Sequence, residues 1–165
     1  MKTNANKWIG IALQLLLVAA LTVLAGATRR HVLDAQRQLT ADGSIPFTLE
    51  SALAFRRIQL VYRDGDLPKI DQGIQYPRGV VTREVDTLGV ERIYARAAKL
   101  WPGTLNLAEK IRWLHLAWFC LAIPGLFFWV KWMGGGVAGG CWAAAFYAVA
   151  ISAVARATGQ ELSHE

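Results

Sequence analysis

Residues 8–28 read WIGIALQLLLVAALTVLAGAT and contain no charged side chain. At about 1.5 Å per residue, a helix of this length spans roughly 30 Å, the thickness of the hydrocarbon core of a bilayer. Lys2 and Lys7 precede the stretch, and Arg29 and Arg30 follow it. The pattern predicts a membrane-spanning helix, and it makes an all-α membrane protein the expected fold class.

A secretory signal peptide is a second interpretation of the same stretch. Lys2 and Lys7 would form its basic region, and Ala25-Gly26-Ala27 resembles a small-residue cleavage site. We favour a retained helix, because the apolar run is long for a signal peptide and further apolar runs follow it. Under both interpretations residues 30–110 are expected outside the cytoplasm.

Two later apolar runs extend the pattern. Residues 111–130 read IRWLHLAWFCLAIPGLFFWV, and residues 137–157 read VAGGCWAAAFYAVAISAVARA. Each is long enough to cross a bilayer. The sequence therefore predicts three transmembrane helices, at about 8–28, 111–130 and 137–157, and a large external loop over residues 29–110.

The third apolar run is rich in small residues. Gly139, Ala143 and Ala144 would let a neighbouring helix approach closely. We expect this face to pack on further membrane helices or on a partner membrane subunit. Cys120 and Cys141 lie inside apolar runs, which favours packed thiols over a disulfide.

Most of the charge lies in the predicted loop. Of the 18 Lys and Arg residues, 13 fall between Arg29 and Lys110, together with 10 of the 12 Asp and Glu residues. No basic face with interleaved aromatic residues stands out, so nucleic acid is not an expected partner. The basic balance suits membrane lipid with anionic or phosphate-bearing headgroups. We expect an integral protein of a bacterial inner membrane or plasma membrane.

The loop itself contains signals for two amphipathic helices. Thr48 is suited to cap a helix whose first turn holds Glu50, and Asp64-Gly65 would end that helix. Residues 67–79 contain two prolines and two glycines, which predicts an ordered loop with extended pieces. A second helix is expected at about residues 82–100, before a capping-box pattern at 106–109.

Acidic residues stand where the chain is expected to leave the membrane. Glu50 follows the first span, and Glu161, His164 and Glu165 follow the third, so the three-span topology puts both sets on one side. Carboxylates and an imidazole could hold Mg²⁺ or Mn²⁺, which could offset the charge of a lipid-linked phosphate. The spacing by itself favours a plainer interpretation, a helix-start charge and a solvated tail.

Three loop segments have a recognisable order: residues 50–57 (ESALAFRR), 65–71 (GDLPKID) and 76–79 (YPRG). In this order they resemble the N-terminal portion of the catalytic subunit of oligosaccharyltransferases. These GT-C membrane glycosyltransferases move a glycan from a polyisoprenyl-phosphate lipid to protein asparagine. Their first external loop carries an acidic residue opening a segment of the type D-S-Y-Y-H-x-R-R, then G-x-x-P-x-x-D-P, then Y-P-x-G.

The resemblance implies roles for particular residues. Glu50 would be the catalytic acid and a metal ligand, with Mg²⁺ or Mn²⁺ as the cofactor. Arg56 and Arg57 would meet the donor phosphate or support the loop. The further metal ligands would be Glu161, His164 and Glu165. This chain departs from the family pattern where Glu50 replaces an aspartate, where Ala52, Leu53 and Ala54 replace two tyrosines and a histidine, and in the spacing of the tail acids.

The resemblance also implies partners and a larger whole. A lipid-linked glycan donor and an acceptor protein would be the substrates. Enzymes of the family have many more membrane helices and a Trp-Trp-Asp-Tyr-Gly signature that this sequence lacks. We therefore expect an N-terminal portion that is inactive by itself. Two alternatives remain open: a GT-C transferase acting on lipid or polysaccharide, and a small non-enzymatic membrane subunit.

Overall fold

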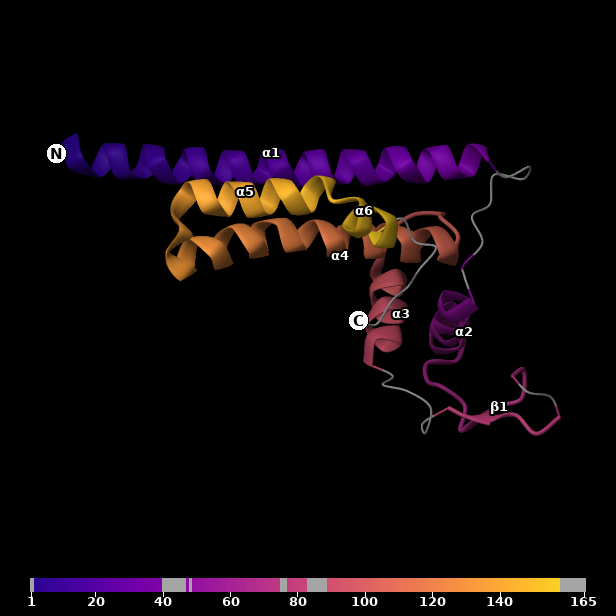
Figure 1. Ribbon diagram of the computed structural model, residues 1–165. Helices are drawn as coiled ribbons and strands as arrows, with labels where there is room; N and C mark the ends of the chain where they lie inside the picture. Colours follow the sequence, from indigo (N-terminus) through magenta and orange to yellow (C-terminus); the bar gives the residue numbers. More distant parts are fainter. Residues whose placement is uncertain (1, 40–46, 48, 75–76, 83–88, 158–165) are drawn as a thin grey trace. The chain divides into compact units, whose positions relative to one another are not determined.

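The computed structural model describes residues 2–39, 47, 49–74, 77–82 and 89–157, without the side chains of residues 2–5, 49, 50 and 157. The chain is mostly helical and divides into two compact units (Figure 1). We call Met1–Ile45 with His115–Gly159 the helical unit. The described residues of Pro46–Leu114 form the loop unit.

The first helix of the helical unit is longer than the predicted span. Helix α1 runs over Lys2–Gln38, because no proline interrupts the polar residues that flank the apolar stretch on either side. A narrow stripe of α1 is buried, including Val18, Ala25 and Leu33. Large apolar side chains around the rest of the helix, such as Leu13 and Leu16, are exposed.

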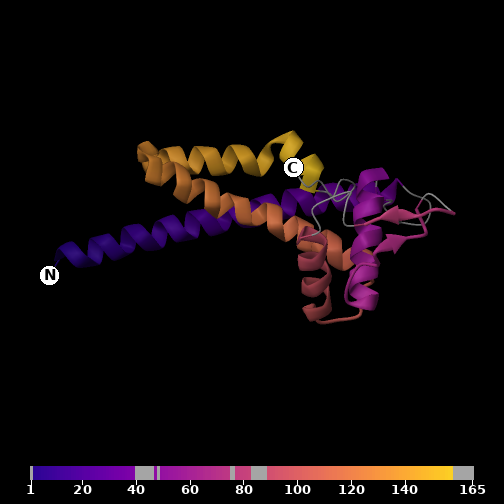
Figure 2. The same cartoon turned by 90° about the horizontal axis from the view of Figure 1, so that it is seen from below.

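The second long helix ends in a sharp reversal of the chain. Helix α4 (Leu107–Val130) continues through Pro124, where the proline predicts a kink. The turn η1 (Lys131–Gly135) then leads into α5 (Gly136–Val149), which runs back along α4 (Figures 1 and 2). Gly134 and Gly136 have φ angles of 95° and 63°, which glycine adopts without steric cost.

The predicted third span is not one continuous helix. Ala150 leaves the helical region with a ψ angle of 123°, and a short helix α6 (Ile151–Ala157) follows it. The buried small-residue stripe consists of Gly140, Ala144 and Ala148, so only Ala144 of the three predicted packing residues belongs to it. A Cβ atom at Gly140 would lie 2.7 Å from the Phe127 carbonyl oxygen, which shows how closely α5 approaches α4.

The loop unit contains two helices and a small hairpin. Helix α2 (Leu49–Asp64) ends where the sequence predicts, and the N–H of Gly65 (φ 87°) donates to the carbonyl of Val61 at 3.0 Å. Strands β1 (Ile70–Asp71) and β2 (Val80–Val81) pair antiparallel, and α3 (Gly89–Leu100) follows. The extended pieces predicted within residues 67–79 correspond in part to this hairpin.

An apolar core holds the loop unit together. The buried faces of α2 and α3 meet each other and the start of α4, whose first turns belong to this unit. Burial of apolar area stabilises such a core by roughly 25 cal/mol per Å² removed from water. The fully buried core residues are Ala54, Ile58, Val61, Leu67, Ala95, Ala98 and Ile111.

Two ranges are long and apolar enough to cross a membrane, Asn6–Gln38 and Leu107–Val149. The second range joins α4 and α5 across their reversal. A signal sequence near an N-terminus or the core helix of a soluble protein also has this length and this apolar composition. In the most apolar window of each range, only 11% and 28% of the residues are buried.

Candidate functional site

The loop motifs are joined by one ion pair. Arg56 on α2 donates from Nε and Nη2 to the two carboxylate oxygens of Asp71 on β1, each at 2.8 Å. The side chain of Asp71 is 4% exposed and that of Arg56 is 43% exposed. A two-bond arrangement of this kind fixes orientation as well as distance, so the pair sets how the hairpin sits on α2.

Asp71 has a second donor in its own turn. The N–H of Gly73 donates to Asp71 Oδ1 at 2.9 Å. This is an Asx-turn, in which an aspartate side chain accepts a hydrogen bond from the main-chain N–H two residues later. The hydrogen bonds from Arg56 hold the pKa of Asp71 below its usual value, against the opposing effect of burial. The same pair raises the pKa of Arg56. Asp71 is therefore a stable carboxylate near neutral pH.

Two glycines make room for this arrangement. A Cβ atom at Gly73 would overlap the guanidinium of Arg56. At Gly79, where φ is 72°, a Cβ atom would come within 2.6 Å of Ile70 Cγ2. The last residue of the YPRG segment thus packs against β1, although Tyr76 of that segment lies outside the described residues.

Arg57 makes a different, buried contact. Its Nη1 lies 3.6 Å from Oε1 of Glu91 on α3, and the two side chains are 4% and 0% exposed. Breaking one half of such a pair is costly, because a charge would remain buried without compensation. The sequence interpretation did not identify Glu91. A usable signal was present, since Arg57 shares the apolar face of α2 with Ala54 and Val61 at helical spacing.

A polar pocket of about 420 Å³ opens beside α2. Arg56, Gln59, Tyr62 and Arg63 line it at helical spacing, together with Leu60 and Leu107. Arg63 pairs with the adjacent Asp64 at 2.8 Å on the exposed surface. The pocket therefore offers hydrogen-bond donors whose positive charge is largely offset by neighbouring carboxylates.

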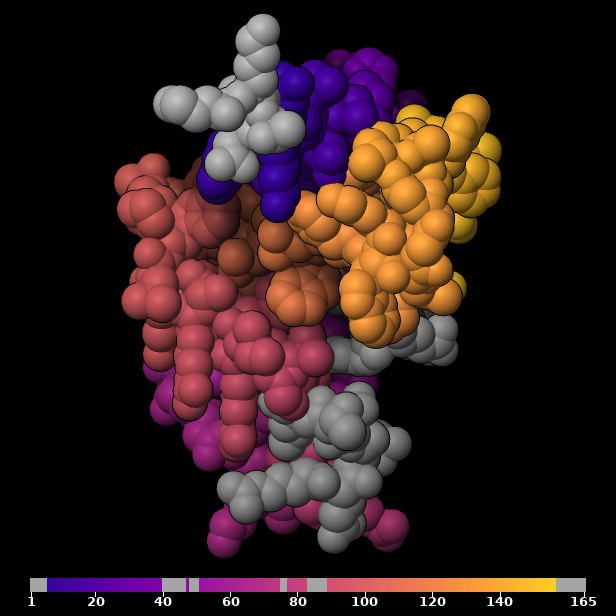
Figure 3. All heavy atoms as spheres, turned by 90° about the vertical axis from the view of Figure 1, so that its left-hand side faces the viewer, coloured from indigo at the N-terminus to yellow at the C-terminus, as the bar shows by residue number. Residues whose placement is uncertain are grey.

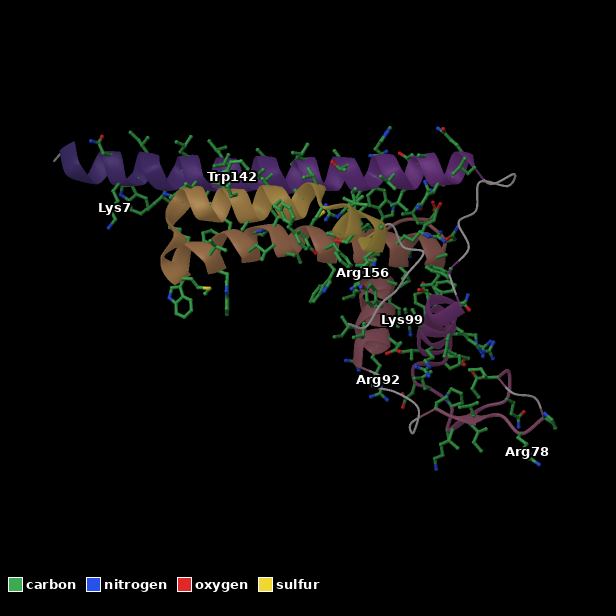
Figure 4. The ribbon with its side chains drawn as sticks, in the orientation of Figure 1. Lys7, Arg78, Arg92, Lys99, Trp142 and Arg156 are labelled. Atoms are coloured by element: carbon green, nitrogen blue, oxygen red, sulfur yellow. The ribbon has the colours of Figure 1, made fainter. Side chains whose placement is uncertain are left out.

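Helix α3 and the segment between the two strands carry further basic residues. Figure 4 shows Arg92 and Lys99 on α3 and Arg78 on the segment between the two strands. Arg92 donates to Asp66 at 2.6 Å, and the Lys99 ammonium lies 5.7 Å from the centre of the Tyr62 ring. These contacts tie α3 to α2 and to the turn after it, and they add to the order of the loop unit.

The side chains of all four predicted metal ligands lie outside the described part of the structure. Glu50 lies in the first turn of α2, as predicted, but its side chain is outside the described part. Glu161, His164 and Glu165 all lie outside the described residues. Within the part of the chain that is described, no group of three or more His, Cys, Asp or Glu side chains could hold a metal ion. The metal set stays a prediction.

Two further basic residues lie in the helical unit: Arg29, which follows the first apolar run, and His115, which lies within the second. Arg29 on α1 and His115 on α4 are both buried in the helical unit, where each contacts main-chain carbonyls of distant helices. Cys120 and Cys141 are free thiols, as the sequence predicts. No family model matches the chain, and no significant match was found among curated proteins or among solved structures.

Proposed function

We propose that this chain forms part of a membrane glycosyltransferase resembling oligosaccharyltransferases, which transfers a glycan from a polyisoprenyl-phosphate-linked donor to protein asparagine. The observation that carries the proposal is the Arg56–Asp71 pair. It joins the arginine of the ESALAFRR segment to the aspartate of the GDLPKID segment, which are two of the three segments on which the resemblance rests.

The burial of Asp71 in this pair favours a functional loop over a simple connector. A connector needs no charge that is 96% covered, because a solvated carboxylate is more stable in water than in a protein interior. The glycine of the third segment packs on the same strand. In this proposal Arg56 and Arg57 support the loop through Asp71 and Glu91, and they place the first turn of α2, which carries Glu50.

The exposure of the long helices supports a membrane location. The core helix of a soluble protein is mostly buried, whereas only 11% and 28% of the residues in the two apolar windows are buried. Exposed apolar side chains at this density suit contact with lipid. The proposed topology has three crossings, by α1, by α4 and by the α5–α6 pair, with residues 29–110 outside the cytoplasm.

The proposed chemistry replaces the bond between the glycan and the lipid phosphate with a bond to the asparagine nitrogen. Glu50 would accept a hydrogen bond from the asparagine amide, orient its nitrogen and take up the proton that the nitrogen loses, while the lipid phosphate leaves with the glycosidic oxygen. Glu50, Glu161, His164 and Glu165 are proposed to hold Mg²⁺ or Mn²⁺, which when bound would offset the negative charge of the departing phosphate. The metal is tested by activity before and after chelation.

The test uses membranes of the source organism with Glu50→Gln placed in its gene. Labelled lipid-linked glycan is supplied, and label is measured in peptide, lipid and polysaccharide fractions. We expect transfer to peptide to fall about 10²-fold or more, the range for loss of a positioned acid or base. Asp64→Asn is the matched control, since Asp64 lies on the exposed end of the same helix.

The outcomes separate the claims. Unchanged transfer with Glu50→Gln would remove Glu50 from the site and leave the function standing. Unchanged transfer after deletion of the whole gene would overturn the function. Label that is lost from lipid or polysaccharide instead of peptide would identify the other GT-C acceptor class.

A further inference from the structure

A fully buried arginine on α1 lies against the C-terminal end of α5 in the helical unit. Arg29 has 0% of its surface exposed. Its Nη1 donates to the carbonyl of Ala25 on its own helix at 3.2 Å and to that of Ala148 on α5 at 3.1 Å. Its Nη2 donates to the carbonyl of Tyr147 at 3.4 Å, and its Cζ lies 5.6 Å from the Tyr147 ring centre.

These carbonyls are available because α5 stops. The N–H of Ala150 still donates to Phe146 at 2.9 Å, but Ala150 then turns out of the helix. In an unbroken helix the carbonyls of Tyr147 and Ala148 would accept from the N–H groups of residues 151 and 152. The break removes those partners and leaves carbonyls at the negative end of the helix dipole, where a cation is favoured.

No described carboxylate pairs with Arg29, so its charge is balanced by other groups. An isolated buried charge is strongly unfavourable. Three carbonyl oxygens and an aromatic ring supply the compensation, and the planar guanidinium suits them because it presents several N–H donors at fixed angles. A lysine ammonium has fewer donors and a different geometry.

The local sequence does not explain the break. Residues 141–157 read CWAAAFYAVAISAVARA and contain neither glycine nor proline. Alanine has the highest helix propensity, so this segment favours one continuous helix. The cause of the break must therefore lie in the tertiary structure, and Arg29 donates hydrogen bonds to the carbonyls just before the break.

We infer that the C-terminal end of α5 is a guanidinium site built from main-chain carbonyls, that Arg29 fills it, and that this contact keeps the chain broken at Ala150. Arg29 acts here as a cation tethered to α1. The other end of α6 is held separately, because Nε2 of the buried His115 lies 3.0 Å from the carbonyl of Arg156 (Figure 4 shows Arg156 on α6).

The test compares Arg29→Ala with Arg30→Ala in the full chain, purified in detergent. Arg30 carries the same charge on the next position of α1, but its side chain is 67% exposed. Amide hydrogen exchange is measured at Ile151 and Ser152, whose N–H groups would bond Tyr147 and Ala148 in a continuous helix. We expect exchange at both to slow about tenfold in Arg29→Ala, the effect of one gained hydrogen bond, and to stay unchanged in Arg30→Ala.

Chemical rescue tests the site itself. Millimolar guanidinium added to Arg29→Ala should restore the original exchange at Ile151 and Ser152. Tetramethylammonium carries the same charge without N–H donors and should not restore it. If Arg29→Ala does not fold, Arg29→Lys is measured instead. Exchange at Ile151 and Ser152 should then be slower than in the wild type, and added guanidinium should move it back toward the wild-type rate.

Three results would overturn the inference: unchanged exchange at both amides in the Arg29 variant, an equal effect of Arg30→Ala, and equal restoration by tetramethylammonium. None of these outcomes depends on glycan transfer, so the inference and the proposed function fail or stand separately.

Discussion

At the residue scale, the ion pairs of the loop unit differ in burial more than in length. Arg63–Asp64 and Arg56–Asp71 both have donor–acceptor distances of 2.8 Å. The first pair lies on the exposed surface, where water and salt screen it and its net contribution is small. Asp71 is almost entirely covered, so its hydration has been replaced by Arg56 and the Gly73 N–H. The stability of the hairpin should therefore depend on Asp71 and hardly on Asp64.

Asp71→Asn should weaken the hairpin in a pH-dependent way. We expect the free energy of local unfolding at pH 7 to fall by about 1–2 kcal/mol, the worth of a charged hydrogen bond after allowance for the part-exposed Arg56. The folded pKa of Asp71 lies below its ordinary value of 3.8. The stabilisation is therefore complete above about pH 3.8 and is lost as the pH falls through the folded pKa.

Amide exchange at Thr82 measures this effect, because its N–H bonds the carbonyl of Lys69 across the hairpin at 3.1 Å. Rates are corrected for the intrinsic pH dependence of exchange. The difference in the free energy of local unfolding at Thr82 between the wild type and Asp71→Asn should become smaller below pH 3.8. Asp64→Asn should give the wild-type value at every pH. A difference that is constant down to the lowest pH would contradict the role given to the Asp71 charge.

At the scale of elements, some boundaries are set locally and one is not. Asn106 caps α4, since its Oδ1 accepts from the Glu109 N–H at 2.9 Å, as the capping pattern predicts. Gly65 ends α2 with a left-handed φ angle of 87°. The break at Ala150 has no comparable local residue, and a distant side chain contacts it instead.

Gly65→Ala tests the local termination of α2. A Cβ atom at Gly65 would meet nothing within 4 Å, so any cost comes from the φ angle alone. We expect the free energy of unfolding to fall by about 1 kcal/mol, the penalty for an L-residue in the left-handed region. Gly89→Ala is the matched control at the start of α3, where the space is equally open and φ is not positive.

Urea unfolding of the full chain in detergent, followed by circular dichroism, gives both values. Gly89→Ala should leave stability equal or slightly higher, because alanine favours a helix. Equal losses in the two variants would show that the left-handed angle at Gly65 is not what matters there.

At the scale of the molecule, the exposed apolar surface of the helical unit has aromatic residues near its reversal. Trp132 is 81% exposed and Met133 is exposed beside it. Figure 3 looks onto this end of the helical unit, with α1 in indigo and the segments around the reversal in orange. Lys131 of the turn donates to Gln14 of α1 at 2.7 Å. Tryptophan and lysine together are typical of a membrane–water interface.

Tryptophan depth tests this arrangement in lipid vesicles. Two variants each keep one of the seven tryptophans, Trp132 or Trp142, with the others changed to phenylalanine. Trp142 is 78% exposed and lies six residues past the start of α5, about 9 Å farther along the helix. A spin label deep in the acyl chains should quench Trp142 more strongly, and a label near the headgroups should quench Trp132 more strongly.

Iodide in the aqueous phase quenches only tryptophans that water can reach. It should quench the fluorescence of Trp132 and not that of Trp142 if α5 lies in the bilayer. Equal quenching of both by iodide, with little quenching by either lipid label, would mean that the helical unit does not enter the membrane and would remove the basis of the proposed topology.

The sequence by itself determined the features that depend on neighbouring residues. The long apolar helices, the end of α2 at Asp64-Gly65 and the cap at Asn106 follow from short-range hydrogen bonds, φ preferences and apolar runs, all of which are visible in a few consecutive residues. The candidate acids were also chosen from the sequence, and Glu50 does lie in the first turn of α2.

Only the tertiary structure decided which charges meet. Arg56 is 15 residues from Asp71, and Arg29 is 119 residues from Ala148, so no local pattern could pair them. The buried stripe of α5 and the break at Ala150 likewise depend on the helices packed beside them. A buried charge is stable only where the fold places a compensating group beside it. The sequence shows which residues are charged, but not which groups will lie next to them.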